Sequence, residues 1–336
     1  MIARNLIILL AIGIFFKSCK PGTDKQEQSS ADTTKVEYKI GKLNDLINQH
    51  PDQANLYHKR ALLQIQRGLF SAAVADEKLA VKFDSLNAAY QLFLADVAFK
   101  AFMVQESIDA FKKCLKIEPN NIEANLKFAE LNLYLKAYPD ALKYANDALV
   151  IDEKQVRAYF VKGFVYKETG DTGKAISSFQ TAVEVDPENY DAYIQLANLF
   201  SALKNSIALQ YYNNALRLRP ASTEALYDRG LFFQDAAKYE LAENDYRTIL
   251  KIDPNYADAY FNLGYIQLVY LNQPKAAIPF LSDAISVSPD FVNAYYNRGM
   301  ANKLLGNKEA ALADFRKALE ISPDYKLAKE QLKVMH

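Results

Sequence analysis

The sequence predicts an all-α fold, a solenoid of about eight stacked helical hairpins with a capping helix at each end. Two observations predict it. One position recurs about every 34 residues and usually holds proline, and small residues recur at two positions within each interval. The recurring residues are Pro51, Ser85, Pro119, Glu153, Pro187, Pro220, Pro254, Pro289 and Pro323. A constant period of this length is typical of arrays in which each hairpin packs only against its neighbours.

The first element is a predicted signal peptide at residues 1–18. Arg4 precedes an apolar run from Leu6 to Phe16, which ends just before Ser18 and Cys19. The run is too short to cross a bilayer as a helix, which takes about 20 residues, and is typical of a cleaved export signal. The serine–cysteine junction resembles a bacterial lipoprotein signal. This resemblance implies lipidation of Cys19 and a lipid-anchored location in the bacterial cell envelope, at the outer membrane. An ordinary secretory signal is the alternative.

Residues 19–35 follow as a predicted flexible tether. From Lys20 to Lys35 the chain has no aromatic or large aliphatic residue, so little apolar burial is available to offset the entropy lost on ordering. Residues 36–53 predict an N-terminal capping helix, because Ile40, Leu43 and Ile47 lie on one helical face. We expect this helix to cover the open end of the first hairpin.

Residues 54–325 hold the predicted hairpin units, which begin at residues 54, 88, 122, 156, 190, 223, 257 and 292. Small residues at the eighth and twentieth positions of each unit allow two helices to approach closely. The eighth-position residues are Ala61, Ala95, Ala129, Gly163, Ala197, Gly230, Gly264 and Gly299. The twentieth-position residues are Ala73, Ser107, Ala141, Ala175, Ala208, Ala242, Ala277 and Ala311. Residues 326–336 predict a polar C-terminal capping helix.

Several irregularities fall between residues 204 and 279. One residue is lost near Lys204, one is gained near Leu271, and Ile249 stands where the other units have a small residue. Pro279 lies inside a predicted second helix, where proline removes a hydrogen bond and bends the helix. We therefore expect the array to be least regular in this stretch.

This pattern resembles the tetratricopeptide repeat, most clearly in the unit from Ala158 to Pro187, and the resemblance covers residues 54–325. It implies a right-handed α-solenoid whose first helices line a concave groove. The groove positions of that family hold mainly apolar and aromatic residues here, with an acidic rim. The residues expected to contact a partner are Leu62, Phe99, Tyr134, Phe160, Phe164, Tyr227, Leu231, Phe261, Tyr265, Tyr296 and Met300. The Lys/Asn/Arg pattern with which some family members grip a peptide carboxylate is absent.

The expected partner is another protein, bound as an extended peptide or an amphipathic helix. Tyr and Phe suit this role because they offer a large contact area for little lost rotamer freedom. The resemblance implies a scaffold or adaptor of the bacterial cell envelope, of the kind that assembles secretion, pilus, motility or outer-membrane complexes. A helical lipoprotein that captures nutrient glycans is the alternative, although the chain has no tryptophan to offer as a sugar platform.

Composition and motifs argue against several other functions. Forty basic residues balance forty acidic ones, so no nucleic acid is expected as a partner. The sequence has no glycine-rich phosphate loop, nucleophile elbow or zinc-binding histidine helix, and we predict neither an enzyme nor a cofactor or metal site. Cys114 takes a position that holds alanine in six other units, which indicates a small buried residue.

Overall fold

The computed structural model describes residues 25–335, so the expected signal peptide and Cys19 lie outside the described residues. The chain divides into two compact parts, residues 1–131 and 132–336, which we call the amino-terminal part and the carboxy-terminal part. Both are built from α-helices joined by short turns, and no β-strand occurs in residues 25–335. The predicted all-α class is confirmed.

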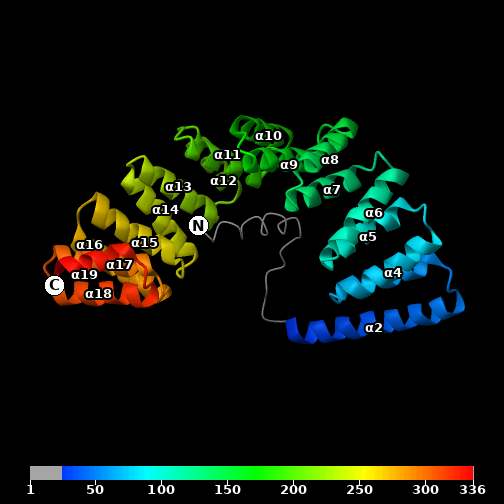
Figure 1. Cartoon of the computed structure of the whole chain (residues 1–336), viewed down its shortest axis with the longest axis horizontal. Coiled ribbons are helices and arrows are strands. Elements are labelled where there is room, and N and C mark those ends of the chain that lie inside the picture. Colours follow the sequence, from blue (N-terminus) through cyan, green and yellow to red (C-terminus); the bar gives the residue numbers. More distant parts are fainter. Residues whose placement is uncertain (1–24, 336) are drawn as a thin grey trace. The chain divides into compact units, whose positions relative to one another are not determined.

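The amino-terminal part contains α2 (Lys25–Gln49), α3 (Ala54–Gln66), α4 (Phe70–Phe83), α5 (Ala88–Lys100), α6 (Val104–Ile117) and the start of α7 (Ile122–Tyr134), drawn from blue to green in Figure 1. Helices α3 and α4 pack as one hairpin and α5 and α6 as the next, while α2 packs on α3. Residues 25–35, which we expected to be flexible, belong to α2. This segment has neither glycine nor proline and several good helix formers, so its local propensity permits the longer helix.

The carboxy-terminal part continues from α7 with further hairpins, drawn from green to red in Figure 1. Its helices are α8 (Tyr138–Ile151), α9 (Val156–Glu168), α10 (Thr172–Val185), α11 (Tyr190–Ala202), α12 (Ala208–Leu218), α13 (Thr223–Asp235), α14 (Tyr239–Ile252), α15 (Ala257–Tyr265), η2 (Ile266–Tyr270), α16 (Pro274–Val287), α17 (Val292–Leu304), α18 (Lys308–Ile321) and α19 (Lys326–Met335). The last helix packs on α18 and lies within the segment expected to cap the array.

The turn inside each hairpin contains one residue in the left-handed backbone region. Glycine takes this place at Gly68, Gly170 and Gly306, where positive φ carries no steric penalty. The sequence did not predict that non-glycine residues adopt the same conformation elsewhere. They are Phe102, Lys136, Lys204, Ala237 and Asn272, with φ between 51° and 60°. The strong preference for a tight helix-to-helix turn therefore overrides the local cost of an L side chain at these positions.

Close contact between the two helices of a hairpin explains the small residues. The residues predicted at the eighth and twentieth positions are all buried. At Gly163 an added Cβ would lie 2.6 Å from Cζ of Phe179, and at Gly230 it would lie 2.8 Å from Cε1 of Tyr246. Such distances leave no room for a methyl group unless the ring moves, so these two units require glycine at the eighth position.

Three hairpins share a buried ion pair between their helices. Arg60, Arg229 and Arg298 each donate two hydrogen bonds to an aspartate sixteen residues later, and these acceptors are Asp76, Asp245 and Asp314. The donor–acceptor distances lie between 2.6 and 3.0 Å. The remaining guanidinium nitrogen donates to a residue sixteen positions earlier, at Asn44, Asn213 or Ser282. Each arginine thus joins its own hairpin to the preceding helix.

The carboxy-terminal part is irregular where the sequence predicted it. Helix α12 is shortened to 11 residues next to the missing residue. The extra residue is absorbed in η2, a π-helical turn in which the Leu271 N–H donates to the Ile266 carbonyl at 3.0 Å. A π-turn is how a helix accommodates one inserted residue without ending. Pro279 lies inside α16, which nevertheless continues to Val287.

Candidate protein-binding surface

All eleven residues expected to contact a partner lie on the first helices of the hairpins, which are α3, α5, α7, α9, α13, α15 and α17. None is fully buried: Leu62 and Tyr134 are exposed, and the other nine are half-buried. Leu62 and Phe99 belong to the amino-terminal part and the remaining nine to the carboxy-terminal part. The structure therefore leaves surface on each side chain, and their contact with a partner stays a prediction.

Ring contacts hold many of these side chains in place. Phe160 and Phe164 lie 5.5 and 5.4 Å from the buried ring of Phe179, both edge-on. Phe261 lies 5.8 Å from Tyr265 and 5.0 Å from Phe291. Because each ring is packed on one side, its exposed side is presented with little conformational freedom left to lose on binding.

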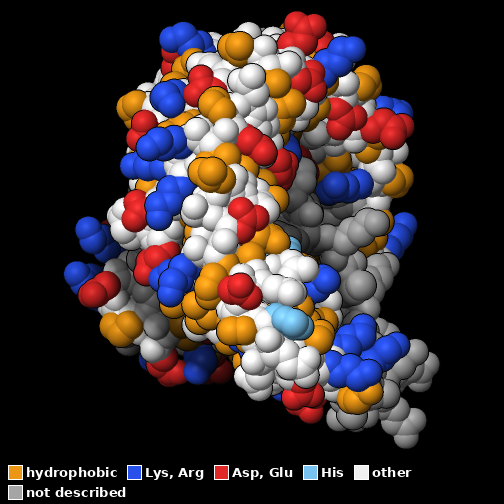
Figure 2. All heavy atoms as spheres, turned by 90° about the vertical axis from the view of Figure 1, so that its right-hand side faces the viewer, with side chains coloured by type: hydrophobic (Ala, Val, Ile, Leu, Met, Phe, Trp, Pro, Cys, Tyr) orange, Lys and Arg blue, Asp and Glu red, His pale blue; other side chains and the backbone are white. Residues whose placement is uncertain are grey.

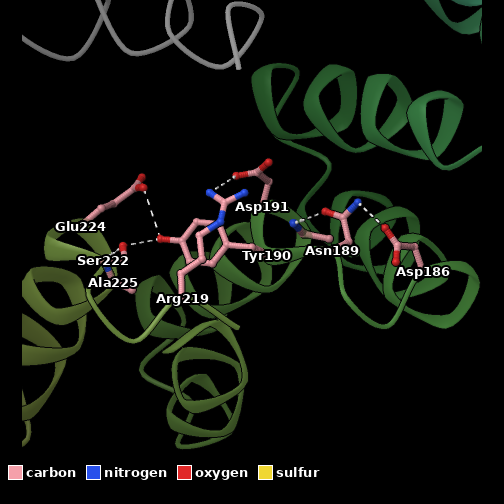
Figure 3. A network of polar contacts seen from close by, with 9 residues as sticks. Asp186, Asn189, Tyr190, Asp191, Arg219, Ser222, Glu224 and Ala225 are labelled. Atoms are coloured by element: carbon pink, nitrogen blue, oxygen red, sulfur yellow. Dashed lines mark hydrogen bonds and ion pairs between the residues drawn. The ribbon is translucent and has the colours of Figure 1, made fainter. Parts of the chain in front are cut away.

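A network of polar contacts surrounds Tyr190 at the start of α11. Its hydroxyl lies 2.6 Å from Oγ of Ser222 and 3.4 Å from Oε2 of Glu224 (Figure 3). The guanidinium of Arg219 lies over the Tyr190 ring at 4.0 Å and its Nη1 is 3.8 Å from Asp191. Burial raises the pKa of Tyr190 to about 12, so the hydroxyl stays protonated and can donate.

Four carboxyl groups of α11, α13 and α15 form an acidic row, which consists of Asp191, Glu224, Asp228 and Asp258. Burial is the main cause that raises the pKa of each. The charges of Asp228 and Asp191 raise the pKa of Glu224 further, whereas Arg219 opposes the shift at Asp191. Glu224 and Asp258 nevertheless remain exposed to solvent, which screens their charges, so an unbalanced negative charge is costlier at the half-buried Asp228.

Asp228 lies among polar groups that sequence reasoning did not bring together. The Asn198 side chain lowers the pKa of Asp228, and its Oδ1 accepts a hydrogen bond from the Tyr212 hydroxyl at 2.7 Å. Asp191, Glu224 and Asp258 occupy groove positions of the family and belong to the acidic rim expected from the sequence. Asp228 stands four residues after Glu224 on α13 and so shares its helical face, and this spacing was the available signal.

The described residues hold no group of three or more His, Cys, Asp or Glu side chains that could bind a metal ion. Cys114 is fully buried, and burial raises the pKa of its thiol to about 11, as expected for a structural cysteine. On the face shown in Figure 2, acidic and basic side chains are interspersed among apolar ones. Over residues 25–335 no helix is long and apolar enough to cross a membrane.

Comparison with known proteins finds the tetratricopeptide repeat. Models of this repeat match residues 156–189, 223–256, 246–278 and 292–325. The DnaJ protein P58IPK homolog A of Oryza sativa subsp. japonica is 24% identical over 95% of this chain and 67% of its own length. Tetratricopeptide repeat protein 6 of Homo sapiens is 28% identical over 60% of this chain and 39% of its own. The chain thus spans between about two fifths and two thirds of these relatives.

A solved structure shares the fold. It is the C-terminal part of a TPR repeat-containing protein from Cytophaga hutchinsonii, with a TM-score of 0.57 at 16% identity. The match covers 68% of this chain and 94% of that one. At this identity the similarity concerns the stacked helical hairpins alone.

Proposed function

The chain is a tetratricopeptide repeat protein, and because such proteins are generally protein-interaction scaffolds, we propose that it binds a segment of another protein on the first helices of its hairpins. The observation that carries this proposal is the row of ordered, half-exposed side chains on α9, α13, α15 and α17. Apolar rings that remain in contact with solvent, although fixed by their neighbours, are suited to an extended peptide or an amphipathic helix.

The proposed role is non-enzymatic and belongs to the bacterial cell envelope. Support for the location comes from the sequence of residues 1–19, with its short apolar run and the serine–cysteine junction. An anchor at Cys19 would keep the hairpins at a membrane surface while their first helices engage a partner. An assembly factor of a secretion, pilus, motility or outer-membrane complex fits this combination.

Replacement of Phe164, Tyr227 and Tyr265 by alanine tests the proposal. The variant should lose co-purification of the partner that the wild-type chain retains, while circular dichroism still reports a helical protein. A matched control replaces Leu86, Phe102 and Val150, which are 79%, 89% and 87% exposed and lie at other positions of the hairpins. Unchanged co-purification with the first variant, or equal loss with the control, would contradict the proposed surface.

A further inference from the structure

Three carboxyl groups of the acidic row lack an opposite charge of their own. Within the described residues, Glu224, Asp228 and Asp258 form no ion pair. The nearby cations have other partners: Arg219 pairs with Asp191 at 3.8 Å and acts on Glu224 only by lowering its pKa through its charge, and Lys167 donates to Oε1 of Gln195 at 2.8 Å. Lys167 lowers the pKa of Asp228 by its charge, without contributing to the shifts at the other two carboxyl groups.

Two tyrosine rings lie among these carboxyl groups. Tyr227 of α13 and Tyr256, which precedes α15, have ring centroids 5.7 Å apart. The charges of Asp228 and Asp258 act on both hydroxyls, and that of Glu224 acts on Tyr256 as well. A ring face beside carboxylates attracts an organic cation by two interactions, a cation–π contact with the ring and an ionic attraction to the carboxylates.

A buried amide provides a separate sign of a missing ligand. Asn262 of α15 is 6% exposed, and its Nδ2 has no hydrogen-bond partner within the described residues. The Asn262 side chain lowers the pKa of Tyr227, which places it near that tyrosine, although no hydrogen bond joins the two groups. A buried donor without an acceptor costs free energy, which an acceptor atom of a ligand would recover.

We propose that this acidic tyrosine face, formed by Glu224, Asp228, Asp258, Tyr227, Tyr256 and Asn262, binds a basic segment of the partner protein. A lysine or arginine side chain of that segment would lie between the carboxylates and against the tyrosine rings. Asn262 would donate to an oxygen of the same segment. The inference rests on the proposed function, which it deepens by assigning the charge of the partner.

Two other occupants of the acidic tyrosine face, a divalent cation and an acidic segment, fit its residues less well. A divalent cation would need three or more oxygen ligands converging on one point, and the described residues contain no such group. An acidic segment would meet three like charges. A basic peptide satisfies the carboxylates, the rings and the unused amide donor together.

The test uses the full chain and short synthetic peptides that share one apolar sequence and differ only in carrying Lys, Gln or Glu at the same positions. Fluorescence anisotropy of labelled peptides gives each dissociation constant. We expect the Lys peptide to bind the wild-type chain roughly tenfold more tightly than the Gln peptide, and the Glu peptide to bind most weakly. The preference should decrease as salt is added.

The variant E224Q/D228N/D258N keeps the shapes of the side chains and removes their charge, so the Lys and Gln peptides should bind it equally. A matched control, E240Q/D283N/E309Q, removes the same number of charges from exposed positions of the second helices α14, α16 and α18. This control should keep the preference for Lys, because it changes the net charge by the same amount and leaves the acidic tyrosine face intact. It therefore separates local recognition from the effect of net charge.

Equal binding of the Lys and Gln peptides to the wild type would overturn the inference, as would an equal loss of preference in both variants. If all three peptides bind equally and the Phe164, Tyr227 and Tyr265 replacements abolish that binding, the scaffold function stands and only the basic partner is refuted. If no peptide binds at millimolar concentration, the basic-segment proposal fails, while co-purification of the native partner still decides the proposed function.

Discussion

Two kinds of helix start recur along the stack, a side-chain cap and an aromatic residue, although α3 and α9 have neither. Before α5, α7, α11 and α13 the chain has Asn87, Asn121, Asn189 or Ser222, whose side-chain oxygen accepts a hydrogen bond from the N–H three residues later. Before α15, α17 and α19 it has Tyr256, Phe291 or Tyr325, whose ring packs on an aromatic residue of the preceding first helix. The centroid distances are 5.7, 5.0 and 5.6 Å.

The start of a helix is thus stabilised either within its own helix or by contact with a neighbouring hairpin. A side-chain cap satisfies a backbone donor of its own helix, so its contribution is local. An aromatic residue at the same place leaves that donor without a side-chain partner and instead joins one hairpin to the previous one. The last hairpins should therefore depend more on their neighbours for stability than the capped ones do.

Loss of a ring at an aromatic start should have the largest effect. Tyr256→Ala or Phe291→Ala should lower the free energy of unfolding by about 2–3 kcal/mol, because a half-buried ring loses its burial and its stacking partner. Urea unfolding followed by circular dichroism measures the change. Tyr256→Phe keeps the ring and should remain near wild type. A loss below about 0.5 kcal/mol for both alanine variants would mean that the rings do not couple the hairpins.

Removal of a side-chain cap should cost less. Asn189→Ala deletes the acceptor of the Ala192 N–H, which lies 3.0 Å away, and should cost about 1 kcal/mol. Gln53 precedes α3 and makes no such bond, so Gln53→Ala is the control and should be nearly neutral. Amide exchange at Ala192 should accelerate in the first variant. Equal stability of the two variants would remove the distinction between capped and uncapped starts.

The turns at the other end of the first helices extend the comparison. Ala237 has φ 56°, so Ala237→Gly should stabilise the chain by about 0.5–1 kcal/mol. Gly170 has φ 81° and open space where a Cβ would lie, so Gly170→Ala should destabilise the chain by a similar amount for conformational reasons alone. Thermal melts of both variants give the two signs. Changes of the same sign would show that side-chain contacts, rather than backbone conformation, govern these turns.

The pH dependence of stability should report on the acidic row, which joins the capped helix α13 to α15 with its aromatic start. The folded-state pKa values of Glu224, Asp228 and Asp258 lie above the ordinary carboxyl range, mainly through burial. The folded state then binds protons more tightly than the unfolded state, so these groups reduce stability as the pH rises above the ordinary carboxyl pKa. E224Q/D228N/D258N should flatten this decline in Tm. An unchanged pH profile would contradict the assigned burial cost.

Much of the fold was predictable because the repeat acts through local packing. The limit to small side chains at positions such as Gly163 and Ala175 recurs in each unit, because two helices that approach closely leave little space wherever they meet. The first-helix location of Phe164 or Tyr265 followed from the same register. The left-handed conformation of Phe102 was not predictable, because its own preference opposes the turn that the flanking helices impose.

Spacing along the chain is enough to specify the helical hairpins, their period, and the places where one residue is missing or added. Tertiary packing, in contrast, sets how the extra residue is absorbed in η2 and which polar groups meet. Asp228 lies on α13, whereas Tyr256 and Asn262 lie at the start of α15 and within it, so they acquire a shared environment only when these two helices are neighbours in the stack. The burial of these residues and the electrostatic field at them depend on neighbours from more than one helix. The sequence of any single segment therefore does not determine them.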